Sequence, residues 1–175
     1  MSKNDNSASV TSIAGQTVPE PVQTYLDLRK LIFNLVPEEI GITPTQAIPN
    51  VWGVVMETGY PAGVATLVSL ADGTTSLYFG TGGGMIGSGN HPAIAKASKS
   101  FVSHAEEFIQ TITPTCIYPL ALIGRVQFYI LSYSGVLAEE ASEADLRSGQ
   151  HKLSILYSSG QQVITQLRLA QEHQK

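Results

Sequence analysis

Cysteine is nearly absent from this sequence, which has a single one, Cys116, among its 175 residues. One cysteine cannot form an intramolecular disulfide, and no cysteine-based metal site can be built from it. No two histidines have the spacing of metal ligands on one helix face, so we expect no metal site. A reducing compartment is consistent with this content, and no basic and then apolar signal follows Met1. We expect a cytoplasmic protein, and the sequence identifies no cofactor.

Charged residues are also scarce, at 14% of the chain where globular proteins usually have about a quarter. A surface built largely from Ser, Thr, Gln and Gly often buries part of itself against a partner, so we expect a homo-oligomer, most simply a homodimer. The net charge of -4 comes without the clustered Lys and Arg of a nucleic-acid-binding surface. Long apolar runs are missing too: a membrane-spanning helix needs about 20 apolar residues, and no run in this sequence approaches that length. We therefore expect neither nucleic acid nor membrane as a partner.

The chain divides into a polar start and one domain. Residues 1–18 are small, polar and without a period, which predicts a disordered N-terminal tail. Residues 19–175 are enough for a single α+β domain with its own core. The domain begins with a predicted helix over residues 22–36, which Pro37 ends because the residue before proline avoids the helical region.

Strands and two further helices follow in a regular order. Residues 51–58 form an almost unbroken apolar run, which predicts a central strand buried on both faces. Strands over residues 64–70 and 74–79 are joined by a hairpin signal at Asp72-Gly73. A helical stripe comes next, strands over residues 125–133 and from Val136 follow, and a helix covers residues 150–172. The stripe is marked by Ile94, Ala97, Phe101, Ala105, Phe108 and Ile112.

This order predicts an α+β fold with a mainly antiparallel sheet of about five strands and three helices packed on it, in the order α-β-β-β-α-β-β-α. The layout broadly resembles that of profilin-like and roadblock-type small domains, which are mostly binding and dimerisation modules. Three strands precede the middle helix here, which differs from the strand order of those domains. No diagnostic motif accompanies the layout, so we assign no family on this basis.

A glycine-rich loop precedes the middle helix and holds six of the sixteen glycines. Residues 82–87 match the pattern G-x-G-x-x-G, but a dinucleotide site needs a parallel β-α-β unit, and the preceding strands are predicted to form a hairpin. A glycine loop at a helix N-terminus also offers free N–H groups to an anion. The candidate residues for a small anionic ligand within and after loop 80–90 are Gly82, Gly83, Gly84, Gly87, Ser88, Gly89, Asn90, His91, Lys96 and Lys99. The alternative is that the glycines serve close packing and the lysines are solvated.

The sequence offers no catalytic constellation. Cys116 could pair with His91, His104 or His151 as nucleophile and base. It lies in an apolar string, however, where a buried and inert thiol is the usual case. A carboxylate pair is conceivable only between Glu57 and the acidic group at residues 139–145, which we interpret as a solvated loop.

Two functional hypotheses follow from these patterns. The first is a non-catalytic protein-interaction or dimerisation module, which acts through a sheet face or the glycine loop. The second is a small-ligand-binding or enzymatic domain that holds an anionic group at loop 80–90. A cleft beside the loop would favour the second hypothesis, and a loop packed against its own sheet or a subunit interface would favour the first.

Overall fold

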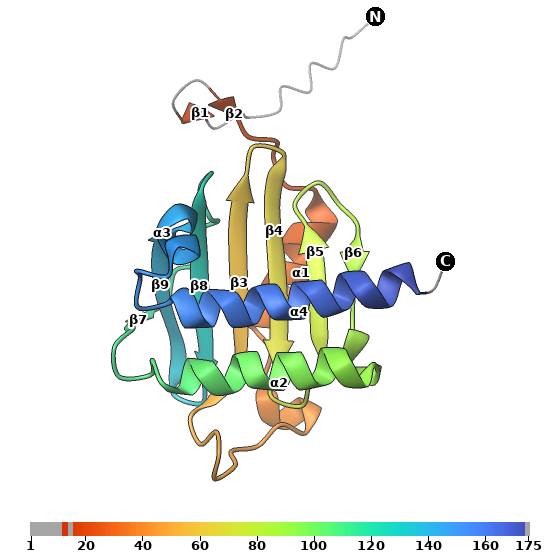
Figure 1. Ribbon diagram of the computed structural model, residues 1–175, viewed down its shortest axis with the longest axis vertical. Helices are drawn as coiled ribbons and strands as arrows, with labels where there is room; N and C mark the ends of the chain where they lie inside the picture. Colours follow the sequence, from red (N-terminus) through yellow and green to blue (C-terminus); the bar gives the residue numbers. More distant parts are fainter. Residues whose placement is uncertain (1–11, 14–15, 174–175) are drawn as a thin grey trace, which may run out of the picture.

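The computed structural model describes residues 12–13 and 16–173, with side chains from Val18 onward. The fold is α+β, with a seven-stranded antiparallel sheet at its centre (Figure 1). Its strands, in their order across the sheet, are β6 (Gly84–Met85), β5 (Thr75–Phe79), β4 (Gly63–Leu70), β3 (Val51–Tyr60), β8 (Arg125–Ser132), β9 (Gly135–Ser142) and β7 (Thr113–Thr115).

Strand β3 lies in the middle of the sheet and is buried on both faces, as its apolar run predicts. It pairs with β4 on one side, from Gly53↔Leu70 to Tyr60↔Gly63, and with β8 on the other, from Val51↔Ser132 to Thr58↔Val126. Its side chains alternate between two separate cores: Val54 and Met56 belong to one, Trp52 and Val55 to the other. Two layers of structure are therefore needed to cover this strand.

Two antiparallel helices cover one face of the sheet, α2 (Pro92–Glu106) and α4 (Ser154–Glu172), and they lie side by side across the strands (Figure 1). Phe101 and Val102 of α2 and Leu156 and Val163 of α4 are fully buried there. Short helix α3 (Glu143–Ser148) follows β9 directly and leads towards α4. The last helix is thus confirmed, with a start a few residues later than predicted.

The opposite face is covered by α1 (Gln23–Phe33), the 3-10 turn η1 (Pro37–Ile40) and the segment 116–123. Tyr25 and Ile32 of α1 are buried against Trp52, Val55 and Val68 of the sheet. Tyr118 stacks on Phe33 with 4.1 Å between ring centroids, which fixes the segment 116–123 to the end of α1. The result is a three-layer arrangement with the sheet in the middle.

The predicted counts of strands and helices were too low. The sheet has seven strands, because two very short outer strands, β6 and β7, were not expected, and α3 raises the α-helices to four. Strands of two or three residues have too few positions to show a period. The acidic group at residues 139–145 is not a loop: Glu139 and Glu140 lie on β9, and Glu143 begins α3.

The middle helix is shorter than its apolar stripe suggested. It ends at Glu106, and residues 107–112 continue as turns in which Phe108 and Ile112 still pack on the helix-side core. The carboxylate of Glu106 accepts hydrogen bonds from the backbone N–H groups of Asn50 and Val51, at 3.3 and 2.9 Å. Glu106 therefore joins the last turn of α2 to the start of β3.

The predicted tail, residues 1–18, lies largely outside the described residues. Within it the structure describes the two-residue strands β1 (Ser12–Ile13) and β2 (Gln16–Thr17), which pair with each other. In the described part of the chain, no helix combines the length and apolar character needed to cross a membrane.

Phe101 offers a direct test of the core between α2 and the sheet. Its side chain is fully buried, so Phe101→Ala is expected to lower the free energy of unfolding by about 3–5 kcal/mol. Phe79→Ala is the matched control because Phe79 is 40% exposed on β5, and its loss is expected to stay below about half of that. Equilibrium urea denaturation measures both; equal losses for the two variants would contradict this assignment of the core.

Candidate functional site

The glycine-rich loop folds back onto the sheet as its outer strand. Gly84 pairs with Tyr78, and a Cβ added at Gly84 would lie 2.3 Å from the carbonyl oxygen of Leu77. Its φ of +145° is also one that side chains disfavour, so glycine is required there for two reasons. Nearby N–H groups already have partners: Gly80 donates to Val64 O at 2.7 Å, and Gly87 donates to Ser76 Oγ at 3.1 Å. Packing against the sheet therefore explains the glycine at position 84 and the hydrogen bonds of the neighbouring N–H groups.

The other candidate residues of the loop fall into two groups: three that line a hollow, and glycines that lie apart from it. Ser88, Asn90 and His91 line a hollow of about 450 Å³ against the end of α4. Ser88 to Asn90 form a 3-10 turn, η2, directly before α2. Gly89 packs on Thr74, whereas the position of a Cβ at Gly82 is nearest to Val22, and open space surrounds Gly83 and Gly87. The glycines thus face different neighbours.

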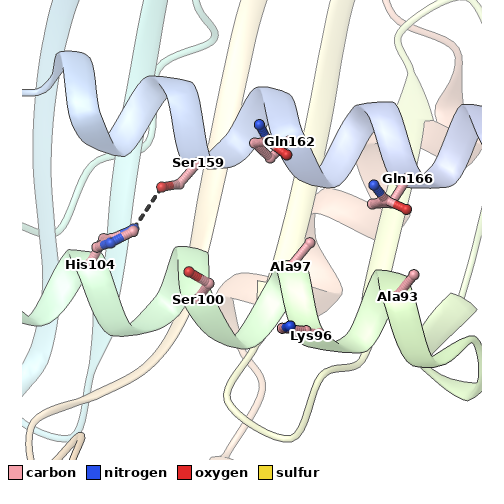
Figure 2. A pocket seen from close by; sticks show the side chains of 8 residues that line it. All are labelled: Ala93, Lys96, Ala97, Ser100, His104, Ser159, Gln162 and Gln166. Atoms are coloured by element: carbon pink, nitrogen blue, oxygen red, sulfur yellow. Dashed lines mark hydrogen bonds between the residues drawn. The ribbon is translucent and has the colours of Figure 1, made fainter.

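The two candidate lysines lie apart from each other. Lys96 lines a groove of about 390 Å³ between α2 and α4, as Figure 2 shows. Lys99 passes beside Gly73 in the β4–β5 turn, where its Cε is 3.2 Å from the position of a Cβ on Gly73. Neither lysine lines the hollow formed by Ser88, Asn90 and His91. The structure therefore brings Ser88, Asn90 and His91 together, and it places the lysines elsewhere.

The groove between α2 and α4 is lined by small, amide and basic side chains. His104 Nδ1 lies 2.6 Å from Ser159 Oγ across it, the contact drawn as a dashed line in Figure 2. The remaining lining residues are Ala93, Ala97 and Ser100 of α2 and Gln162 and Gln166 of α4. His104 and Ser159 are thus a base and a hydroxyl at hydrogen-bond distance, but among the described residues no third group bonds to the other ring nitrogen of His104 to orient it, as a catalytic triad requires.

Cys116 is exposed rather than buried, which corrects the expectation drawn from its apolar neighbours. Within the apolar run around it, Tyr118, Leu120 and Ala121 are partly buried against the sheet, whereas Ile117 is 71% exposed. Across the described residues, no hydrogen bond links Cys116 to a histidine. His104 bonds to Ser159, and Nδ1 of His151 accepts from the N–H of Leu153 at 3.1 Å.

A buried ion pair at the centre of the sheet is the main polar feature that the sequence did not reveal. Arg29 of α1 donates to both carboxylate oxygens of Glu57 on β3, at 2.7 and 3.1 Å. Glu57 is completely buried, and only 12% of the Arg29 side chain is exposed. The hydroxyl of Thr66 lies 2.7 Å from that of Tyr25 and 3.4 Å from the Glu57 carboxylate. Twenty-eight residues separate the ion-pair partners, so no local pattern could have joined them.

The protonation of this cluster follows from its burial. Burial raises the pKa of the Glu57 carboxyl above its usual value, and the Arg29 guanidinium opposes that shift. For Arg29, burial would lower the pKa, but the hydrogen bond and the charge of Glu57 outweigh it and the pKa is raised. The tyrosines around the pair have pKa values raised by burial and then by the charge of Glu57, namely Tyr25, Tyr78 and Tyr129. Their phenols therefore stay protonated, and the cluster holds α1 on the sheet.

A third hollow is an apolar pocket of about 620 Å³ at one end of the sheet. Three stretches of chain form it: the residues before α1, the β3–β4 hairpin end and the segment that leads into β8. Its lining residues are Val18, Pro19, Glu20, Pro21, Gly59, Tyr60, Gly63, Val64, Leu120, Ala121, Leu122, Ile123 and Arg125. Apolar atoms dominate this wall, and among the described residues that line it Glu20 and Arg125 are the charged ones. We call it the hairpin-end pocket.

A close approach of two backbones builds the wall of the hairpin-end pocket. Gly124 N–H donates to Gly59 O at 2.9 Å, and Gly59 bridges to Ile123 in parallel orientation. A Cβ at Gly59 would lie 2.1 Å from the carbonyl oxygen of Leu122. Any side chain at this position would therefore push residues 121–123 away from β3.

The described residues include no group of three or more His, Cys, Asp or Glu side chains that could hold a metal ion. Comparison with known protein families, with curated proteins and with solved structures finds no match to this chain. Any functional conclusion therefore depends on the geometry of its own residues.

The buried ion pair predicts a non-additive pair of substitutions. Arg29→Met and Glu57→Leu each leave the other charge buried without its partner, so each is expected to lower the free energy of unfolding by about 3–5 kcal/mol. The double variant removes both charges and is expected to recover most of this loss. Urea denaturation of the four proteins gives the coupling; a double variant as unstable as the sum of the two single variants would show that the pair does not act as a unit.

Gly59 predicts a loss of stability that its backbone conformation alone would not cause. Gly59→Ala places a methyl group against the Leu122 carbonyl and is expected to cost about 3 kcal/mol or more. Gly41→Ala is the control, because Gly41 has a φ of +78° but open space around it, and its expected cost is about 1–2 kcal/mol. Thermal melting compares the two variants, and a smaller loss at position 59 than at position 41 would contradict the close approach.

Proposed function

We propose that this chain is a non-catalytic binding module and that the hairpin-end pocket is its binding site. The observation that carries the proposal is the combination of size and chemistry in this pocket. Its volume of about 620 Å³ lies in the range of small-ligand sites, about 300–1,000 Å³. Its wall is apolar apart from two charged side chains, and such sites bind by burying apolar surface while a few polar groups fix the orientation.

The apolar side chains at the mouth of the pocket support this proposal. Leu122 is 47% exposed and Tyr60 is 37% exposed, and both line the pocket. Covering these side chains would remove apolar surface from water at about 25 cal/mol per Å². A ligand that fills the pocket and covers its rim therefore gains binding free energy from the apolar surface buried at both places.

The proposal concerns one site and leaves the other expectations from the sequence as predictions. These are the protein-interaction and homodimer hypothesis and a small anionic ligand at loop 80–90. The loop packs on the sheet through Gly84, which agrees with the condition set for the interaction hypothesis. Ser88, Asn90 and His91 border a hollow, which keeps a ligand at the loop open to test.

A neutral apolar dye tests the hairpin-end pocket. N-phenyl-1-naphthylamine fluoresces in apolar surroundings and is expected to show saturable binding to the protein. Leu122→Glu places a carboxylate in the apolar wall and is expected to weaken binding by about tenfold or more.

Leu31→Glu is the matched control, since Leu31 is 63% exposed on α1 and does not line the pocket. It is expected to bind the dye as the unmodified protein does, and melting temperatures show that both variants are folded. The proposal fails if binding is not saturable or if the two variants bind equally.

A further inference from the structure

We propose that the natural occupant of the hairpin-end pocket is a small amphipathic anion, an apolar chain that ends in a carboxylate, and that Arg125 binds the carboxylate. This inference rests on the proposed function, because it names the ligand class of the same site. Two features carry it: the hydrogen-bond donors that Arg125 has left, and the position of Arg125 at the edge of the apolar wall.

Arg125 has unused donors at the edge of an apolar wall. It is the first residue of β8, and its backbone N–H donates to Leu122 O at 2.9 Å, which fixes it next to the exposed leucine of the pocket. Its Nε donates to Glu140 at 2.9 Å. Among the residues described, its two terminal NH2 groups make no other hydrogen bond. They remain available to a ligand, and a guanidinium prefers a planar carboxylate that accepts two parallel bonds.

The ion pair with Glu140 is partly solvated and can share Arg125. The side chains are 39% and 35% exposed for Arg125 and Glu140, so the pair is of the weak surface kind. A ligand carboxylate at the pocket mouth would meet the terminal donors while Glu140 keeps Nε. Beyond Leu122 the wall continues through Val64 and Leu120, where an alkyl chain would be buried.

Besides Glu140, Glu20 is a charge that opposes an anion here, and it lines the pocket. It is exposed and lies between Pro19 and Pro21 in an irregular stretch, so its carboxylate is hydrated. Arg125, in contrast, is held by a sheet strand and by the Gly124–Gly59 bond beside it. A positioned cation over an apolar wall favours the anion, and a cationic ligand paired with Glu20 is the competing outcome.

Three ligands with the same ten-carbon chain separate these outcomes at pH 8: decanoate and decylamine, each below its micelle concentration, and decanol, below its solubility limit. Calorimetry or displacement of the neutral dye gives their affinities. Decanoate is expected to bind about tenfold more tightly than decanol, because charge-assisted hydrogen bonds add to the same apolar contact. Decylamine is expected to bind most weakly.

Two variants that break the same ion pair have opposite effects on the binding of decanoate. Arg125→Gln removes the cation and is expected to abolish the preference for decanoate over decanol. Glu140→Gln frees Arg125 and is expected to keep or increase that preference. A purely structural role of the ion pair would instead make the two variants alike, in binding as well as in melting temperature.

The results also separate this inference from the function on which it rests. Equal binding of decanoate and decanol, or unchanged preference in Arg125→Gln, would overturn the anion while the pocket stands. Tightest binding of decylamine would overturn it in favour of Glu20. If none of the three binds and the dye does not either, the proposed function fails as well.

Discussion

The burial of β3 on both faces is the constraint on which the rest of the structure depends. A strand with Val54 and Met56 on one side and Trp52 and Val55 on the other is stable only between two apolar layers. The α2–α4 pair supplies one layer, and α1 with the segment 116–123 supplies the other. Glu57 is the exception on this strand. Its buried charge requires a partner, and Arg29 can reach it only if α1 lies across the sheet at one position. The ion pair thus fixes the position of α1 on the sheet. Apolar contacts alone would position this helix less specifically.

Much of this architecture could be predicted because it is local. The apolar run at residues 51–58 identified the central strand, the Asp72-Gly73 signal identified the β4–β5 hairpin, and the stripe through Phe101 identified the buried face of α2. The carboxylate of Asp72 accepts from the N–H of Thr74 at 2.8 Å, which is the kind of bond that a turn signal encodes. Each of these features depends on neighbours within a few positions along the chain.

The site could not be predicted, because it depends on contacts between distant segments. The hairpin-end pocket needs residues near 20, 60 and 122 to meet, and Gly59 shows no sign in the sequence that another backbone crosses it. Glu57 was visible only as a carboxylate at the end of an apolar strand, with no indication of Arg29. The composition of the glycine loop suggested a ligand site, yet Gly84 is explained by its pairing with Tyr78. A high glycine content shows that the backbone of a loop can adopt unusual conformations. Whether these serve a ligand or close packing depends on the tertiary structure.

The two outermost strands, β6 and β7, leave the seven-stranded sheet with little edge to which another strand could pair. Each is only two or three residues long; one contains Gly84 with its left-handed φ, and the other contains Pro114, which has no N–H to donate. Neither border therefore offers the straight row of donors and acceptors that templates addition of a foreign strand. Growth of the seven-stranded sheet by edge-to-edge pairing is therefore disfavoured at both borders, even though its interior strands are rich in β-branched residues.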